Sequence, residues 1–314
     1  MKAFALTTAD APASLVDLPD PETAAGTIRV RIRAATVNGF DAQHATGLFT
    51  TMMPHDLPTV IGRDFAGVVE EVGDGRTDIA IGDEIFGFVP YTPPLHDGSF
   101  ADIIVSADLI FARKPGGLSF KTAASLGLAG IAALDLVDAV DPKDGDVVVV
   151  AGATGGVGSI AVQLAAQRGA TVVATAKPGD EEAFVRGLGA SETVDYAAGD
   201  VAEQIRARYP AGIDALIDTS NRDDAASVLA ALVRDGGRLA TTQGTADAEG
   251  LATRTVRATN IVASPTPEKL ASLAAPAASG DLQVHIQETF ALADVDAALA
   301  VFSAGTIGKI VLAS

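Results

Sequence analysis

The sequence predicts an α/β protein with two domains, one a β-barrel-like domain and the other a doubly wound parallel sheet. Three observations indicate this fold class. Up to about residue 115, short apolar segments alternate with Gly, Pro and Asp turns. From about Lys121, strand-like segments alternate with helix-like segments. A β-branched segment at 147–151 also runs straight into the glycine-rich sequence 152–158. Strands that alternate with helices are typical of a parallel sheet covered by helices.

The first domain is predicted from short segments rich in β-branched and aromatic residues. Gly82-Asp83 and Asp97-Gly98 mark tight turns between such segments. The expected strands cover residues 27–34, 65–72, 84–89 and 100–105. We expect them to close into a compact β-barrel-like domain.

The second domain is predicted from alternating strands and helices. The expected strands are 147–151, 171–175, 193–195, 215–218 and 238–241, and the expected helices are 122–140, 156–168, 181–188, 201–209 and 225–234. Beyond Asn260 we expect strand 261–264, helix 267–279, strand 285–290, helix 293–304 and strand 309–312. The last strand is expected to rejoin the first domain. That domain then comprises 1–118 and 265–314, and the second comprises 119–264.

The glycine-rich turn is the most informative feature of the chain. A strand ends in Ala151-Gly152-Ala153-Thr154-Gly155-Gly156-Val157-Gly158, and a helix with one apolar face follows. Glycines let the backbone approach a dinucleotide pyrophosphate, and the helix N-terminus offers unpaired N–H groups. The expected phosphate contacts are the backbone at Thr154, Gly155, Gly156 and Val157. The charge-free stretch 147–166 also has the length of a membrane span, but its glycines and its change of period favour a buried strand–turn–helix unit.

Composition limits the classes of function. The chain has 314 residues, 48% of them hydrophobic, which is enough for a sizeable core. It contains no cysteine, which excludes disulfides and thiolate metal sites and favours a reducing compartment. The net charge of −18 disfavours nucleic acid and anionic membranes as partners. The first residues lack the apolar core of a signal peptide, so we expect a cytoplasmic protein.

Several motifs occur in the order and spacing of one known family. They are Thr36-Val37-Asn38-Gly39-Phe40-Asp41, Gly62-Arg63-Asp64-Phe65-Ala66-Gly67, Gly82-Asp83-Glu84-Ile85-Phe86-Gly87, the glycine run at 152–158, Leu188-Gly189-Ala190, Val194-Asp195-Tyr196 and Gly308-Lys309-Ile310-Val311-Leu312. Together they resemble the zinc-independent quinone oxidoreductases, the zeta-crystallin-like branch of the medium-chain dehydrogenase/reductase superfamily. The resemblance implies a GroES-like catalytic domain, a Rossmann domain, a nicotinamide cofactor in the cleft between them, and a homodimer.

Three residues are candidates for catalysis. The resemblance implies that Asn38 and Asp41 line the substrate and nicotinamide cleft, although Asn38-Gly39 by itself also favours a turn. The family usually has a proline where this chain has Gly39. Tyr91 lies in a proline-rich loop and is a candidate proton donor, or else a packing aromatic residue.

The cofactor type depends on the end of the strand predicted at 171–175. No carboxylate follows this strand directly, and Lys177 is placed to meet a 2′-phosphate, with Tyr196 beside it by resemblance. This favours NADPH over NADH. The acidic run Asp180-Glu181-Glu182 suits the first turn of a helix, but it would weaken phosphate binding, and one of its members could reach the ribose. The other cofactor contacts implied by the resemblance are Thr241, Thr242, Gln243 and Lys309.

The sequence argues against a catalytic zinc. The zinc-dependent relatives use cysteine ligands and a Gly-His-Glu element, whereas this chain has no cysteine and carries Gly62-Arg63-Asp64 there. Without a Lewis acid, alcohol oxidation loses its means of lowering the alcohol pKa. Hydride donation to an electrophilic acceptor remains feasible.

We therefore expect a zinc-independent, NADPH-dependent oxidoreductase that reduces a quinone or an α,β-unsaturated carbonyl compound. Two alternatives stay open. One is an enoyl-thioester or polyketide-type enoyl reductase on the same fold. The other is a non-catalytic NADPH-binding sensor or structural protein, because a fold does not by itself establish turnover.

Overall fold

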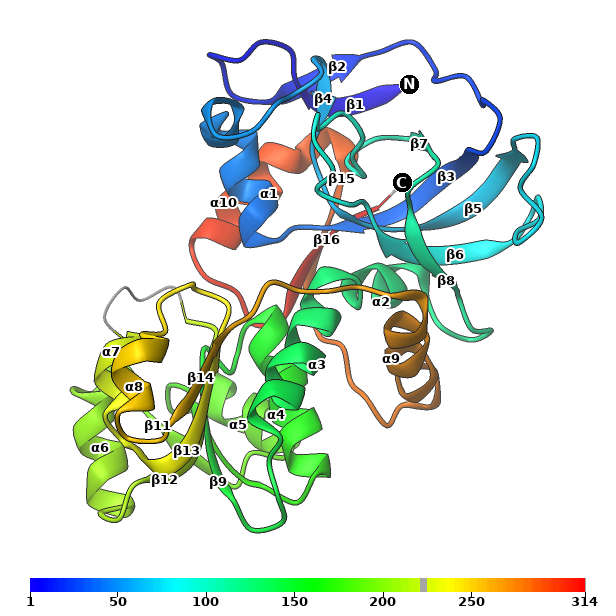
Figure 1. Ribbon diagram of the computed structural model, residues 1–314. Helices are drawn as coiled ribbons and strands as arrows, with labels where there is room; N and C mark the ends of the chain where they lie inside the picture. The colour runs from blue at the N-terminus through cyan, green and yellow to red at the C-terminus, as the bar shows by residue number, and fades with distance from the viewer. Residues whose placement is uncertain (221–224, 314) are drawn as a thin grey trace. The chain divides into compact units, whose positions relative to one another are not determined.

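Strands dominate the N-terminal third of the chain, and strands alternate with helices beyond it (Figure 1). The computed structural model describes residues 1–220 and 225–313. The chain forms two units, of which unit 1 contains Met1–Leu128 and Pro265–Ser314 and unit 2 contains Ala129–Ser264. The predicted fold class, a GroES-like domain and a parallel-sheet Rossmann domain, is confirmed.

Unit 1 is built on a mixed sheet with the strand order β15-β16-β3-β5-β6-β8, and β7 also pairs with β3. These strands are β3 (Ile28–Thr36), β5 (Asp64–Val72), β6 (Glu84–Phe88), β7 (Ile103–Ser106), β8 (Ile110–Arg113), β15 (Ile286–Ala291) and β16 (Lys309–Ala313). A smaller antiparallel sheet contains β1 (Lys2–Leu6), β2 (Ser14–Asp17) and β4 (Thr59–Val60). The helical segments are α1 (Gly39–Ala45), η1 (Leu48–Thr51), α2 (Phe120–Ser125), α9 (Pro267–Ser279), η2 (Leu292–Asp294) and α10 (Val295–Ser303).

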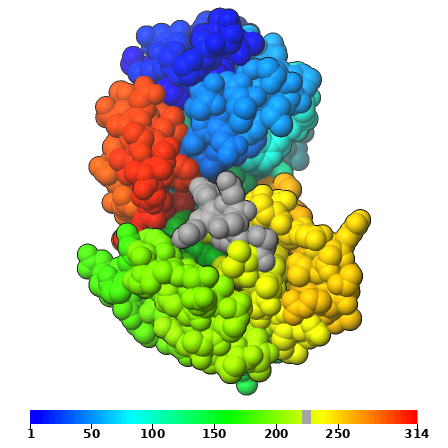
Figure 2. Space-filling model, turned by 90° about the vertical axis from the view of Figure 1, so that its left-hand side faces the viewer, coloured from blue at the N-terminus to red at the C-terminus, as the bar shows by residue number. Residues whose placement is uncertain are grey.

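The core of unit 1 joins segments from both ends of the chain. β16 pairs antiparallel with β3, as Val311 with Thr36. The blue N-terminal and red C-terminal parts of unit 1 accordingly lie side by side (Figures 1 and 2). Phe65, Phe100 and Ile310 are buried in one apolar cluster between these elements. The predicted return of the last strand to the first domain is therefore accompanied by burial of its consecutive apolar residues, Ile310, Val311 and Leu312.

The prediction of a single helix at 122–140 is wrong, because two helices occupy this segment. α2 ends at Ser125, and α3 (Leu128–Val140) begins after a break. At the break the backbone N–H of Leu128 donates to Asp64 Oδ1 at 2.6 Å, and a Cβ on Gly127 would lie 2.4 Å from the same oxygen. α2 packs on β3 and β5 and belongs to unit 1, which extends to Leu128.

Unit 2 is a parallel sheet with the strand order β11-β10-β9-β12-β13-β14. Its strands are β9 (Val147–Ala151), β10 (Thr171–Thr175), β11 (Glu192–Val194), β12 (Ile213–Asp218), β13 (Val233–Thr241) and β14 (Arg257–Asn260). Its helices, after α3, are α4 (Gly156–Gln167), α5 (Asp180–Gly187), α6 (Val201–Arg208), α7 (Ala225–Ala230) and α8 (Ala248–Ala252). Val149, Val173 and Leu216 are buried in its core, as expected for central parallel strands.

Two elements of unit 2 differ from expectation. The helix predicted at 225–234 ends at Ala230, because Val233 already pairs with Ile213 in the sheet. The strand predicted at 261–264 lies earlier, at Arg257–Asn260. Among the described residues, none of the helices combines the length and the apolar character that crossing a membrane requires. The charge-free stretch 147–166 is divided between β9 and α4.

Candidate cofactor-binding and catalytic sites

The glycine turn of unit 2 is closely packed on one side and open on the other. Gly152 follows β9 with a φ of +76°, a conformation that favours glycine. A Cβ on Gly158 would lie 2.1 Å from the Gly152 carbonyl oxygen, so only glycine lets α4 approach β9 this closely. Gly155 is the N-cap of α4, and as a glycine it has no side chain to cap the helix. A Cβ on Gly155 would meet its nearest neighbour only at 3.5 Å. An open, uncapped helix N-terminus fits a pyrophosphate.

This turn lies where the sheet order reverses. β9 and β12 are neighbours, while β10 and β13 lie on opposite sides of the pair. Ligands of open parallel sheets bind at such a switch point, at the carboxyl ends of the strands. Thr219, just after β12, donates from Oγ1 to the Ala151 carbonyl oxygen at 2.9 Å. Thr241 ends β13 opposite Asp218, and its Oγ1 accepts from the Gln243 N–H at 3.0 Å. Thr241, Thr242 and Gln243 therefore lie at the same edge as the glycine turn.

Lys177 and Tyr196 converge on a third residue, Glu181. Lys177 Nζ lies 3.0 Å from Glu181 Oε1, and the Tyr196 hydroxyl donates to the same oxygen at 3.0 Å. Tyr196 follows β11 and Lys177 follows β10, which are adjacent strands. The structure thus brings together the two residues proposed for a 2′-phosphate, but with a carboxylate between them.

The candidate residues Asn38, Asp41 and Lys309 meet in a buried polar cluster of unit 1, together with Asp64. Asn38 Nδ2 donates to Asp64 Oδ2 at 2.9 Å and to Asp41 Oδ2 at 3.1 Å. Asn38 Oδ1 accepts from Lys309 Nζ at 2.5 Å, and Lys309 Nζ also donates to the Val37 carbonyl oxygen at 3.1 Å. Lys309 Nζ lies 3.9 Å from Asp64 Oδ2. Both the oxygen and the nitrogen of the Asn38 side-chain amide therefore have hydrogen-bond partners within the protein.

Burial dominates the electrostatics of this cluster. It raises the pKa of Asp41 to about 7, with the neighbouring Asp64 adding to the effect and Arg63 opposing it. Burial also raises the pKa of Asp64, against the nearby ammonium of Lys309. The pKa of Lys309 is lowered by burial, against Asp64 and Asp41. The cluster holds several ionisable groups out of water, and their hydrogen bonds offset part of that cost.

Tyr91 belongs to an aromatic group around the guanidinium of Arg63. The rings of Tyr91 and Phe40 have centroids 4.3 Å apart in an edge-on arrangement. Arg63 Cζ lies 5.5 Å from the Tyr91 centroid and 5.7 Å from the Phe40 centroid, within cation–π range. Burial, with Asp41 adding to it, raises the pKa of Tyr91. The phenol is therefore a weaker acid than an exposed tyrosine.

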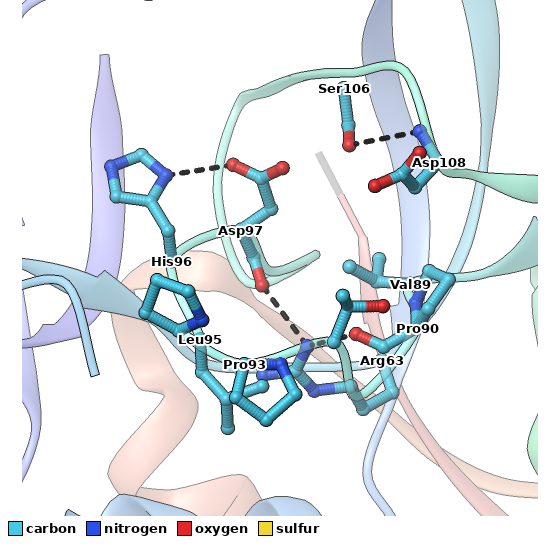
Figure 3. A pocket seen from close by; sticks show the side chains of 11 residues that line it. Arg63, Val89, Pro90, Pro93, Leu95, His96, Asp97, Ser106 and Asp108 are labelled. Carbon is cyan, nitrogen blue, oxygen red and sulfur yellow. Dashed lines mark hydrogen bonds and ion pairs between the residues drawn. The ribbon is translucent and has the colours of Figure 1, made fainter. Parts of the chain in front are cut away.

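Arg63 also lines a pocket of about 240 Å³ in unit 1, together with His96 and Asp97 (Figure 3). Its Nη1 donates to the carbonyl oxygens of Pro90 and Asp97, each at 3.2 Å. Its Nε and Nη2 have no hydrogen-bond partner among the residues that the structure describes. The arginine that stands where the zinc-dependent relatives have a histidine thus lines a pocket and lies beside the aromatic group.

Sequence reasoning did not find the contact between His44 and His55. Their Nε2 atoms are 2.9 Å apart, and His44 is buried on α1 next to the ring of Phe40. The two histidines have no recognisable spacing, so no sequence signal indicated the pair. Within 1–220 and 225–313, no three His, Asp or Glu side chains are grouped so that they could hold a metal ion.

Comparisons with known proteins agree with this architecture. Residues 24–107 match the model of the alcohol dehydrogenase GroES-like domain, and residues 156–270 match that of the zinc-binding dehydrogenases. The chain is 33% identical over 200 residues to a 2-haloacrylate reductase from Burkholderia sp, covering 63% of this chain and 59% of the relative. It is 33% identical over 201 residues to the chloroplastic NADPH-dependent alkenal/one oxidoreductase of Arabidopsis thaliana, covering 62% and 51%. The chain thus spans between half and two thirds of the length of these relatives.

Among solved structures, the quinone oxidoreductase from Coxiella burnetii superposes with a TM-score of 0.88 and 28% identity, covering 100% of this chain and 99% of that one. The superposition covers both units of this chain. The chain therefore belongs to the medium-chain dehydrogenase/reductase superfamily, and it is similar to the quinone oxidoreductases of that superfamily.

Proposed function

We propose that this protein is a zinc-independent, NADPH-dependent reductase of quinones or α,β-unsaturated carbonyl compounds. The observation that carries the proposal is the open, uncapped glycine turn at the switch point of unit 2, which fits a dinucleotide. Relatives named as a 2-haloacrylate reductase and an alkenal/one oxidoreductase support an activated C=C bond as the acceptor. The absence of cysteine and the Arg63-Asp64 pair in place of His-Glu support a reaction without zinc.

The residues of unit 2 would hold the cofactor. The backbone of Thr154, Gly155, Gly156 and Val157 would bind the pyrophosphate. Lys177 and Tyr196 would meet the 2′-phosphate, and Thr241, Thr242 and Gln243 would border the nicotinamide. When bound, NADPH supplies the hydride. The chain's own contribution is to position the acceptor and to support the negative charge that develops on its oxygen.

In unit 1 we assign the acceptor contacts to the aromatic group and Arg63. Phe40 and Tyr91 offer flat apolar surfaces, and Arg63 offers a fixed positive charge beside them. Asn38 and Asp41 would act as positioning residues, because their polar atoms bind each other, Asp64 and Lys309. We assign the proton that completes the reduction to water, since the raised pKa of Tyr91 makes it a poor donor.

The test is the oxidation of NADPH and NADH by the chelator-treated protein with a panel of quinones, enones and an enoyl thioester, with analysis of the reduced products. We expect turnover with a quinone or an enone, and no loss of rate after chelation. Turnover with the thioester alone would favour the enoyl reductase alternative. Binding of both cofactors without any oxidation would refute the catalytic proposal.

A further inference from the structure

The carboxylate of Glu181 has an unusually complete set of donors for a residue in the first turn of a helix. Lys177 Nζ lies 3.0 Å from Oε1, and the Tyr196 hydroxyl donates to the same oxygen at 3.0 Å. The backbone N–H of Lys177 donates to Oε2 at 2.9 Å. The Glu181 side chain is only 13% exposed, whereas that of Lys177 is 49% exposed. The Glu181 carboxylate is therefore largely shielded from solvent.

A phosphate monoester accepts hydrogen bonds from the same kinds of donor. An ammonium, a phenolic hydroxyl and a backbone N–H beside a helix N-terminus together make an anion site. The site follows β10, the strand next to the one that ends in the glycine turn. In a dinucleotide-binding sheet this is the place of the adenosine ribose. A 2′-phosphate bound here would have to share Lys177 and Tyr196 with Glu181.

Glu181 and a 2′-phosphate would repel each other, because both are anions competing for one ammonium. A carboxylate at this place can instead accept a hydrogen bond from a free ribose 2′-hydroxyl, as carboxylates do in NAD sites. The neighbouring Glu182 differs in its contacts. Its Oε1 accepts from Arg186 Nε at 2.9 Å and from the Thr193 hydroxyl at 3.0 Å. The carboxylate of Glu182 is therefore a matched acidic control, because it binds Arg186 and Thr193. Glu182 meets Lys177 only through its backbone N–H, which donates to the Lys177 carbonyl oxygen at 3.0 Å.

We propose that Glu181 lowers the cofactor selectivity of this protein by competing with a 2′-phosphate for Lys177 and Tyr196. Its carboxylate makes the preference for NADP(H) over NAD(H) smaller than Lys177 and Tyr196 alone would give. The inference rests on the proposed function only in taking unit 2 to bind a nicotinamide dinucleotide. It does not depend on turnover or on the identity of the acceptor.

The test is calorimetric titration of the full chain with NADP⁺, NAD⁺ and 2′,5′-ADP. Wild type, Glu181→Gln, Glu182→Gln and Glu181→Gln combined with Lys177→Met are compared. Gln keeps the size of the side chain and its capacity to accept from Tyr196 while removing the charge. We expect Glu181→Gln to raise the affinity for NADP⁺ relative to NAD⁺ by about three- to tenfold, a modest effect because Lys177 is half exposed and screened. The same variant should tighten 2′,5′-ADP, and adding Lys177→Met should cancel both gains.

The control and the contrary outcomes separate the two proposals. Glu182→Gln should change the NADP⁺ to NAD⁺ ratio by less than about twofold. If Glu181→Gln binds both dinucleotides with an unchanged ratio, the role of Glu181 is refuted and the proposed function stands. If the wild type and every variant bind no dinucleotide, both proposals are refuted. Thermal unfolding of each variant without ligand shows whether a lost affinity reflects a lost fold.

Discussion

His44 allows a quantitative test of the buried part of unit 1. Burial, with the positive charge of Arg63 and the neighbouring His55 adding to it, lowers the pKa of His44 to about 3. His55 Nδ1 lies 2.8 Å from the Met53 carbonyl oxygen, so it carries the proton and donates. His55 Nε2 is then an acceptor, and His44 Nε2, 2.9 Å away, is its donor. The contact is consistent with two neutral imidazoles, with the proton of His44 on Nε2.

The depressed pKa of His44 couples stability to pH with a definite sign. The unfolded chain has the ordinary histidine pKa of about 6.5, whereas the folded chain does not protonate His44 until about pH 3. Below pH 6.5 the unfolded state therefore binds a proton that the folded state does not. The stability contribution is fully present above pH 6.5 and is lost as the pH falls. Between about pH 7.5 and about pH 5, linkage gives a loss of about 2 kcal/mol.

The assay is urea unfolding of wild type and His44→Gln over this pH range. We expect the free energy of unfolding of the wild type to fall by about 2 kcal/mol more than that of the variant. Asp41, whose pKa is raised to about 7, contributes a change of opposite sign, but it is present in both proteins and cancels in the comparison. His96 is a control: Asp97 raises its pKa, so His96→Gln should not reduce the loss at low pH. Identical pH profiles for wild type and His44→Gln would refute the assignment of a neutral, buried His44.

Three further predictions concern the two candidate sites. Lys309→Met should destabilise the protein by about 3–5 kcal/mol in urea unfolding, because it leaves the buried Asp64 carboxylate without its counter-ion; a loss below about 1 kcal/mol would contradict this. Gly158→Ala should lower the affinity for NADP⁺ in titration calorimetry at least about tenfold, because its Cβ would lie 2.1 Å from the Gly152 oxygen and force the glycine turn to shift. Tyr91→Phe should change kcat by less than about threefold in the reductase assay, whereas loss of a general acid would cost about 10²- to 10⁴-fold.

The sequence predicted those parts of the fold that depend on local residue patterns. The segment 147–158 combines a β-branched strand, a glycine turn and an amphipathic helix within a few residues, and each signal depends only on its neighbours. The alternation of strands and helices likewise identified the parallel sheet. These elements form because period, glycine placement and burial agree locally.

What the sequence did not predict depends on contacts between distant segments. The helix expected at 122–140 breaks because Asp64, on β5, accepts the N–H of Leu128. Lys309, expected near the cofactor, donates to Asn38 and Val37 at the other end of the chain. Glu181 was expected as a helix-start residue, and its contact with Tyr196 depends on how α5 packs against β11. No local pattern specifies such pairs, because the fold alone brings the segments together.

α1 begins at Gly39, where the family usually has a proline, and side-chain contacts hold its first turn. Proline favours the first position of a helix because its φ is fixed there. α1 has seven residues, too few to be stable alone. Asp41 Oδ2 accepts the backbone N–H of Asn38 at 2.9 Å, which closes the first turn. Lys309 and Asp64 then fix the Asn38 side chain from the sheet. The buried charged groups of unit 1 therefore hold the first turn of α1 in place. α1 in turn positions Phe40 in the aromatic group beside Arg63.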